Sequence, residues 1–224
     1  MIPWTMTETS QVPGEGGAIS LHRRGEEFSI RVDGRELMNS RRHGSEEDLA
    51  HLACKAIAGL PDSRILIGGL GMGYTLATAL KRLAPSATVM VAELVPAVIR
   101  WNQKFLGHLA GNPLDDQRVT IIQGDVAQII AESSQAFDAI LLDVDNGPDG
   151  LTHKENDRLY QTGGLAAAHK ALKPGGALAV WSATKDSSFT KKLSSAGFAV
   201  TINKVHARAG NKGARHIIWL AKKK

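Results

Sequence analysis

The sequence predicts an α/β fold. A mostly parallel seven-stranded sheet has helices on both faces and ends in an antiparallel hairpin, and a small antiparallel β unit precedes it. Three observations predict this fold. From residue 64 onward, short apolar runs alternate with amphipathic segments, as in a parallel sheet covered on both faces. A Gly-Asn-Lys-Gly turn at 210–213 joins the last two runs and favours a hairpin. Near the N-terminus, apolar and polar residues alternate on both sides of Asp33-Gly34, a strong turn signal.

The individual elements follow from the periodicity of the apolar residues. Strands of the main sheet are predicted at 64–67, 88–92, 119–122, 137–142, 177–181, 198–206 and 214–221. Helices are predicted at 45–58, 73–84, 96–106, 156–172 and 187–196. The first helix opens at Ser45 with Glu46, Glu47 and Asp48 in its first turn, where carboxylates favour the exposed N–H groups.

The chain divides into three parts. Residues 1–17 are rich in Gly, Pro, Thr and Ser and lack periodicity, so we expect a flexible arm. Residues 18–44 form the small N-terminal β unit, with strands at 18–22, 28–32 and 36–38. Residues 45–224 form the main domain.

Composition is that of an ordinary globular protein, with 224 residues of which 43% are hydrophobic and 22% charged. The single cysteine, Cys54, cannot form an internal disulfide and lies in a predicted amphipathic helix, so we expect a buried, inert thiol. No apolar run is long enough to cross a bilayer, and the N-terminus does not resemble a signal peptide. These features predict a cytoplasmic protein.

The net charge of +5 comes from basic residues near both ends of the chain. Such ends can meet an acidic partner. No nucleic-acid-binding module is recognisable, and we therefore interpret them as solvated surface and expect no nucleic-acid partner.

A glycine-rich loop joins the first main strand to the next helix. Glycines at such a loop let the backbone turn sharply and approach a ligand, and the helix N-terminus adds a partial positive charge. The dinucleotide fingerprint G-x-G-x-x-G does not fit, because its last position is Tyr74. The register is instead G-x-G-x-G, at Gly69, Gly71 and Gly73, which is typical of sites for S-adenosylmethionine.

Acidic residues follow three of the next strands. Glu93 closes the second strand, where a carboxylate can accept both hydroxyls of a ribose. Gly124 and Asp125 follow the third strand, where the aspartate can bond an adenine amino group, and Asp143 ends the fourth. Because ligands of open α/β sheets bind at the carboxyl ends of the strands, these residues predict an adenosyl nucleoside site.

These pieces, in this order, resemble the spermidine synthase family within the class I S-adenosylmethionine-dependent methyltransferase superfamily. The likeness covers roughly residues 18–200. It rests on the β unit before a Rossmann-like domain and on the stretches Ile67-Gly68-Gly69-Leu70-Gly71-Met72-Gly73, Ala92-Glu93-Leu94-Val95-Pro96, Asp116-Gln117-Arg118-Val119, Gly124-Asp125, Phe137-Asp138-Ala139-Ile140-Leu141-Leu142-Asp143 and Leu172-Lys173-Pro174-Gly175-Gly176. The β unit points most narrowly to aminopropyltransferases.

The resemblance implies a transferase of polyamine biosynthesis that moves an aminopropyl group from decarboxylated S-adenosylmethionine to an amine. It places the aspartate that accepts the acceptor's proton at Asp143. It implies a Rossmann-like nucleoside-binding catalytic domain over 45–224, and with the β unit it makes a homodimer plausible.

The chain departs from the family pattern at charged positions. Gly71 stands where the family has an aspartate that holds the donor's amine, and Asp143-Val144-Asp145-Asn146 replaces Asp-Ser-Ser/Thr-Asp. Losing a carboxylate near the donor's tail removes a group that would repel the carboxylate of intact S-adenosylmethionine. Methyl transfer to a small molecule is therefore an alternative function, and non-catalytic nucleoside binding is another.

Further candidates concern the acceptor. Asp145 and Asn146 begin a Gly/Pro-rich loop after Asp143 that can cover the nucleoside, and Tyr160 follows as a pocket-lining or core residue. The eight histidines lack ligand spacing, so we expect no metal site.

Overall fold

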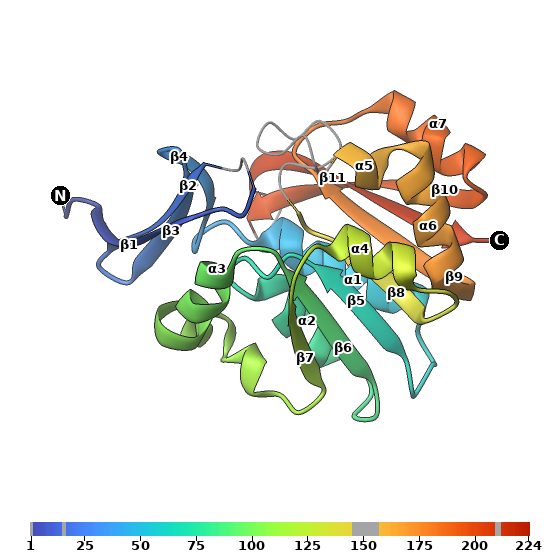
Figure 1. The fold of residues 1–224 in the computed structure, drawn as a ribbon, viewed down its shortest axis with the longest axis horizontal. Helices are drawn as coiled ribbons and strands as arrows, with labels where there is room; N and C mark the ends of the chain where they lie inside the picture. Colours follow the sequence, from blue (N-terminus) through green and yellow to red (C-terminus); the bar gives the residue numbers. More distant parts are fainter. Residues whose placement is uncertain (1, 15–16, 145–156, 209–211) are drawn as a thin grey trace.

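The computed structural model describes residues 2–14, 17–144, 157–208 and 212–224. These residues form two β-sheets, which we call the N-terminal sheet and the central sheet (Figure 1). Asp145, Asn146 and the predicted covering loop lie outside the described residues. In the described part of the chain, no helix has the length and apolar character needed to cross a bilayer.

The N-terminal sheet is antiparallel throughout, with its strands in chain order. Its strands are β1 (Thr5–Gln11), β2 (Ala18–Arg24), β3 (Glu27–Val32) and β4 (Arg35–Asn39). Asp33 and Gly34 join β3 to β4 with φ angles of 48° and 77°, as the predicted turn requires. The three predicted strands of the β unit are confirmed.

Strand β1 was not predicted, because residues 1–17 were expected to lack regular structure. The structure instead pairs Thr5–Gln11 with β2 through a bulge between Met6 and Glu8. The indole Nε1 of Trp101 also donates to Glu8 Oε2 at 2.8 Å. Because β1 is an exposed, polar edge strand, its sequence lacks the apolar alternation by which strands are recognised.

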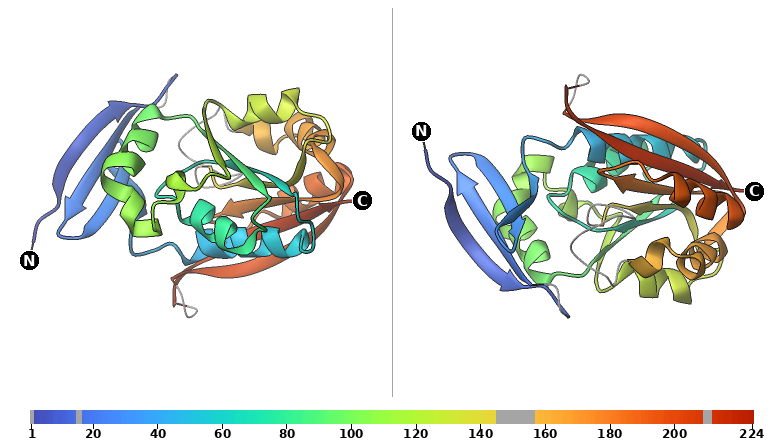
Figure 2. Two further views of the ribbon diagram at one scale, coloured as in Figure 1. Left: turned by 90° about the horizontal axis from the view of Figure 1, so that it is seen from below. Right: turned by 90° about the horizontal axis from the view of Figure 1, so that it is seen from above.

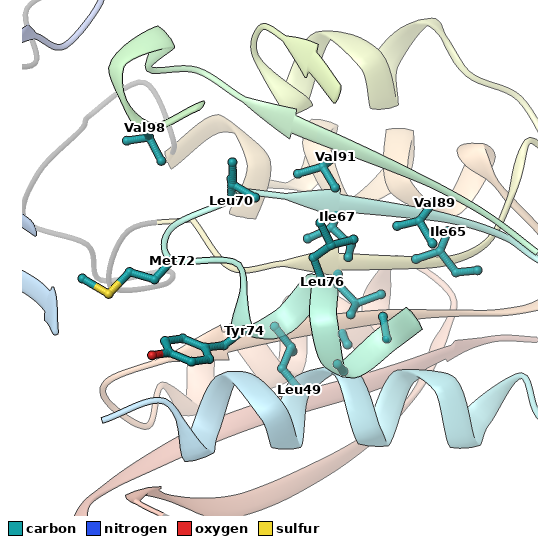
Figure 3. Close-up of a cluster of buried hydrophobic side chains, with 14 of the residues drawn as sticks. Leu49, Ile65, Ile67, Leu70, Met72, Tyr74, Leu76, Val89, Val91 and Val98 are labelled. Carbon is teal, nitrogen blue, oxygen red and sulfur yellow. The ribbon is translucent and has the colours of Figure 1, made fainter. Parts of the chain in front are cut away.

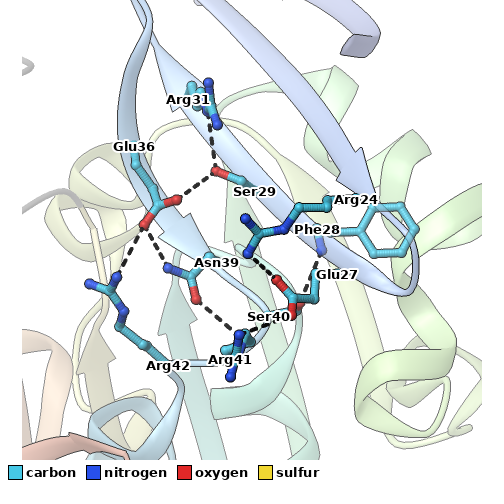
Figure 4. A network of polar contacts seen from close by, with 10 residues as sticks. All are labelled: Arg24, Glu27, Phe28, Ser29, Arg31, Glu36, Asn39, Ser40, Arg41 and Arg42. Atoms are coloured by element: carbon cyan, nitrogen blue, oxygen red, sulfur yellow. Dashed lines mark hydrogen bonds and ion pairs between the residues drawn. The ribbon is translucent and has the colours of Figure 1, made fainter. Parts of the chain in front are cut away.

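One face of the N-terminal sheet carries a network of ion pairs and hydrogen bonds (Figure 4). Glu27 pairs with Arg24 at 2.6 Å and with Arg41 at 3.0 Å. Glu36 accepts from Ser29 at 3.0 Å and from Asn39 at 2.6 Å. Much of the positive charge near the N-terminus is therefore paired with carboxylates.

The central sheet has the order β10-β11-β9-β8-β5-β6-β7. Its strands are β5 (Arg64–Gly68), β6 (Thr88–Glu93), β7 (Val119–Gln123), β8 (Phe137–Leu142), β9 (Leu172–Ser182), β10 (Phe198–Arg208) and β11 (Lys212–Lys223). Strands β5 to β9 are parallel, whereas β11 runs antiparallel to both β9 and β10. The predicted fold class, including the C-terminal hairpin, is confirmed.

Helices cover both faces of the central sheet (Figure 2). They are α1 (Gly44–Ala56), α2 (Tyr74–Arg82), α3 (Pro96–Trp101), α4 (Val126–Glu132), α5 (Asp157–Tyr160), α6 (Thr162–Ala171) and α7 (Ser187–Ser195). Short turns of other helix types follow α3, namely a π-helix (Asn102–Leu106) and two 3₁₀ helices (Gly107–Ala110 and Pro113–Asp115). Helix α4 was not predicted, and the predicted helix 156–172 is divided at Gln161.

The two faces have separate hydrophobic cores because successive strand residues point in opposite directions. In β5, Ile65 and Ile67 pack with α1, α2 and α3, and Leu66 packs with α4, α6 and α7. Figure 3 shows the first of these cores, in which Leu49 of α1 and Leu76 of α2 lie beside β5. Cys54 is buried in the same core, as predicted.

Candidate active site

A pocket lies at the carboxyl ends of β5, β6 and β8 and extends under the N-terminal sheet. Apolar side chains line the part next to the N-terminal sheet, namely Val12, Ile19, Ile30, Val32, Leu37 and Met38. Polar groups line the other part, namely Glu46, Thr75, Glu93, Asp125 and Asp143. The pocket therefore joins an apolar wall to a group of carboxyls.

The glycine-rich loop forms the floor of this pocket. Gly69 and Gly71 line it with φ angles of 89° and 53°, which side-chain-bearing residues rarely adopt. A Cβ atom on Gly69 would also collide with the carbonyl oxygen of Asp143. Gly73 does not line the pocket: it caps α2 with a φ of 82° and packs against Pro113. The first two glycines shape the cavity, and the third shapes the helix start.

Gly71 is paired with a side chain of the N-terminal sheet. A Cβ atom on Gly71 would lie 2.9 Å from the sulfur of Met38, which is closer than real contacts of this kind. The space where a side chain at position 71 would begin is thus filled by a thioether. At this point the wall of the pocket is apolar.

Glu93 presents its carboxylate at the end of β6. Its side chain is buried, with Oε2 accepting from the backbone N–H of Leu70 and Oε1 from that of Val95, both at 2.8 Å. One of these donors belongs to the glycine-rich loop, so the loop and the carboxylate fix each other's position. A carboxylate at the end of a parallel strand is the kind of group that accepts ribose hydroxyls.

Gly124 and Asp125 both line the pocket after β7. Asp125 caps α4, because its Oδ1 accepts from the N–H of Ala127 at 2.8 Å. Its Oδ2 pairs with Arg158 of α5. The cap sets the direction of α4, and the ion pair ties this side of the pocket to α5.

Asp143 follows β8 and opens into the pocket. Thr75 of α2 donates to its Oδ2 through Oγ1 at 2.6 Å. Loss of solvation in the pocket raises the pKa of Asp143 to about 6, although the hydrogen bond from Thr75 opposes the rise. A carboxyl with such a pKa is largely ionised at neutral pH and is still a competent base.

Glu46 is the residue that sequence reasoning missed. It lies in the first turn of α1 and lines the same pocket as Asp143. Loss of solvation, followed by the charge of Asp143, raises the pKa of Glu46 to about 8. Glu46 and Asp143 form what we call the acid pair. The sequence showed a run of acids there, but only the packing of α1 on the sheet determines which one faces the pocket.

The remaining predicted residues lie elsewhere. Tyr160 is buried against Phe189 with ring centroids 5.7 Å apart, and its hydroxyl donates to the carbonyl oxygen of Val144 at 3.5 Å. It supports the segment that follows Asp143 and is not among the residues that line the pocket. Within the described residues, no group of three His, Cys, Asp or Glu side chains could hold a metal ion.

Thr75→Val is expected to move the acid limb of the pH–rate profile to higher pH. The hydrogen bond from Thr75 lowers the pKa of Asp143, so its loss raises that pKa and delays ionisation of the base. The measurement is kcat/KM as a function of pH. Thr88→Val, at an exposed position of β6, serves as control, and an unmoved acid limb in Thr75→Val would exclude this role.

The Glu46→Gln variant is expected to lose less stability than the wild type as the pH rises. The folded protein holds the Glu46 proton with a pKa of about 8, against 4.5 ordinarily, so this stability is present below 4.5 and is lost as pH rises through 8. Glutamine cannot ionise, and each kcal/mol regained raises Tm by about 2–4 °C. Thermal unfolding at several pH values between 4.5 and about 8 measures this change in stability. Glu132→Gln, at an exposed position at the end of α4, should behave like the wild type, and an equal slope in Glu46→Gln would contradict this explanation.

Comparison with known proteins finds relatives of this chain. Residues 42–209 match the spermine/spermidine synthase domain. The chain is 30% identical over 138 residues to a polyamine aminopropyltransferase of Pseudomonas syringae, which covers 61% of this chain and 43% of the relative. It is 30% identical over 198 residues to one of Mycobacterium tuberculosis, which covers 84% of this chain and 36% of the relative. The chain thus spans less than half the length of these relatives.

Solved structures share the fold at low sequence identity. The spermidine synthase of Thermotoga maritima superposes with a TM-score of 0.75 at 19% identity, over 98% of this chain and 72% of that one. A spermidine synthase in complex with the transition state analogue AdoDATO superposes with a TM-score of 0.74 over the same shares. Because the matching family domain extends over most of the sequence, this chain belongs to the spermine/spermidine synthase family.

Proposed function

We propose that the protein transfers an aminopropyl group from decarboxylated S-adenosylmethionine to an amine acceptor. The observation that carries the proposal is the acid pair, since Glu46 and Asp143 open into the pocket that also contains Glu93. A pocket with carboxyls deprived of solvent favours cationic ligands, and both the donor and an amine acceptor are cations. The names of the relatives agree with this activity.

The donor nucleoside is assigned to the glycine-rich loop and the strand ends beside it. Glu93 accepts the ribose hydroxyls, and Gly124 and Asp125 lie beside the adenine. The acid pair disfavours a carboxylate on the donor's tail, which selects the decarboxylated form over intact S-adenosylmethionine. The acid pair therefore supplies the charge that Gly71 lacks.

Asp143 is assigned as the base. The acceptor arrives as an ammonium ion and gives one proton to the Asp143 carboxylate. The neutral amine then attacks the carbon beside the sulfonium. A C–N bond forms as the C–S bond breaks, and the electron pair of that bond goes to sulfur. The products are a neutral thioether nucleoside, methylthioadenosine, and a longer polyamine whose new nitrogen carries the positive charge.

Methyl transfer is the second candidate, and one observation favours it. Met38 fills the space beside Gly71, so the glycine-rich loop has no carboxylate for the amine of the donor's tail. The acid pair weighs against it, because its charge repels the carboxylate of intact S-adenosylmethionine.

The test is a turnover assay with each donor and a panel of diamines and polyamines. We expect methylthioadenosine and an aminopropylated amine from the decarboxylated donor, detected by mass spectrometry. Formation of S-adenosylhomocysteine from the intact donor, with no aminopropylated product from the decarboxylated one, would establish methyl transfer instead.

A further inference from the structure

A chain of hydrogen bonds leads from the acid pair toward the C-terminal hairpin. The Oγ atom of Ser45, which is buried at the start of α1, lies 2.7 Å from Glu46 Oε2. The same Oγ lies 2.9 Å from Nδ1 of His216 in β11. The His216 ring is half-buried and meets the edge of Trp181 with centroids 4.8 Å apart. The hydroxyl of Ser45 thus bridges a carboxyl in the pocket and an imidazole closer to the surface.

We propose that Glu46, Ser45 and His216 form a proton outlet that carries the proton released by aminopropyl transfer from the pocket to solvent. The inference rests on the proposed function, because that reaction releases a proton. The total number of cationic nitrogens is the same in reactants and products, because the donor's amine is carried over to the acceptor. The donor's sulfonium is neutralised, so charge balance requires that one proton depart. Each turnover must therefore return Asp143 to its ionised form.

The outlet depends on proton transfer between the two carboxyls of the acid pair, which we call the hand-off. Before reaction, Asp143 is ionised and Glu46 holds a proton, because burial and the charge of Asp143 raise its pKa. When Asp143 takes the acceptor's proton its charge disappears, and the pKa of Glu46 falls. Glu46 then donates through Ser45 Oγ to Nδ1 of His216, and the opposite ring nitrogen releases a proton to water. The proton on Asp143 then passes to Glu46, which returns the acid pair to its starting state with a single negative charge on Asp143.

His216 has the properties that this role needs. Burial and then the nearby His206 lower its pKa below 6.5, so the ring is neutral at physiological pH and Nδ1 can accept a proton. A hydroxyl accepts one hydrogen bond while donating another, so Ser45 can pass a proton without becoming charged. The edge contact with Trp181, which itself lines the pocket, fixes the ring orientation.

Other charged and titratable groups surround this path. After burial, the charge of Asp143 at the end of β8 and then that of Glu47 on the same helix raise the pKa of Glu46. Burial, followed by the charges of Glu46 and Glu47, raises the pKa of Tyr74 to about 12. The charge of His206 on β10 acts on both His216 and Asp48, and that of His51 on α1 acts on Asp48. These groups influence the pKa values of residues along the path. Among the hydrogen bonds of the described residues, only those of Ser45 connect Glu46 to His216.

The first experiment removes the two outer members of the path. Ser45→Ala and His216→Ala should each lower kcat about tenfold while leaving KM for the amine nearly unchanged, because proton release becomes slow and binding does not (general acid–base steps contribute about 10²–10⁴-fold when fully lost). Added imidazole should restore kcat in His216→Ala and not in Ser45→Ala. The matched control is His169→Ala, because His169 also has a lowered pKa and an edge contact with an aromatic ring, Phe198, remote from the pocket.

An infrared measurement tests the same path without turnover. At neutral pH the wild type should show a protonated carboxyl band that disappears in Glu46→Gln and is much weaker in Asp143→Asn, where Glu46 no longer feels the charge of Asp143. Persistence of the band in Glu46→Gln would overturn the hand-off.

The two experiments separate this proposal from the proposed function. The wild type could turn over while Ser45→Ala and His216→Ala keep an unaffected kcat and imidazole has no effect. That result would overturn the proton outlet and leave the proposal of aminopropyl transfer intact. Absence of aminopropylated product from the wild type would overturn both, whatever the infrared spectrum shows.

Discussion

Asp143→Asn is expected to lower the rate of aminopropyl transfer by about 10²–10⁴-fold, the usual contribution of a positioned general base. An amide keeps the shape of the side chain and can still accept from Thr75, whose hydroxyl lies 2.6 Å from the carboxylate. It cannot take a proton from the acceptor's ammonium. Donor affinity should change little, because the nucleoside is held by other residues. Steady-state kinetics together with donor titration measure both effects.

Asp138→Asn is the matched control for this change. Asp138 is a buried aspartate on the same strand, where it accepts from the backbone N–H of Arg64 at 2.8 Å and from Lys173 at 2.6 Å. Its loss should lower Tm without removing the chemical step. If Asp143→Asn turned over at the wild-type rate, the assignment of Asp143 as the base would be wrong.

Glu93→Gln is expected to weaken donor binding by about 10–100-fold, which corresponds to the loss of roughly 1.5–3 kcal/mol from hydrogen bonds to a charged group. Both carboxylate oxygens accept backbone N–H groups, from Leu70 and Val95. A glutamine would turn its NH₂ group toward one of these donors, which displaces the glycine-rich loop as well as removing an acceptor for the ribose. Calorimetric titration with the donor measures the loss.

Glu132→Gln is the control for the change at Glu93. Glu132 is an exposed carboxylate at the end of α4 that contacts Gln128 at 2.9 Å and no part of the pocket. It should bind the donor like the wild type. A Glu93→Gln variant with unchanged donor affinity would show that the nucleoside lies elsewhere.

The fold was predictable because its determinants are local in the sequence. The apolar runs of β5 and β8 are buried on both faces, so each reads as a continuous run. The positive φ angles of Gly69 and Gly71 are an essentially glycine-specific requirement, which makes the loop visible as a motif. The positions of Glu93 and Asp143 follow from strand ends, which the same periodicity locates.

Other parts of the structure could not be predicted from the sequence, because they depend on contacts between distant segments. Strand β1 is polar and is held by pairing with β2 and by Trp101, neither of which its own sequence reveals. The predicted helix 96–106 becomes a π-helix after Trp101, where the Asn102 side chain donates to the carbonyl oxygens of Val98 at 2.9 Å and Gly71 at 2.8 Å. That bond ties the helix to the glycine-rich loop.

The acid pair of the pocket could not be predicted from the sequence for the same reason. Glu46 and Asp143 are 97 positions apart and meet only because α1 packs beside the end of β8. Likewise, the space beside Gly71 is taken by Met38 of the N-terminal sheet. Sequence motifs therefore located the residues that we assign to the nucleoside, whereas the charges that we propose to select the donor and the acceptor emerged from tertiary packing.

The most direct test of the account is a calorimetric comparison of decarboxylated and intact S-adenosylmethionine. We expect tighter binding of the decarboxylated form. The difference between the two should be smaller in the double variant Glu46→Gln/Asp143→Asn, which removes the negative charge of the acid pair that repels the carboxylate of the intact molecule. Tighter binding of intact S-adenosylmethionine to the wild type, or binding of neither compound, would contradict it.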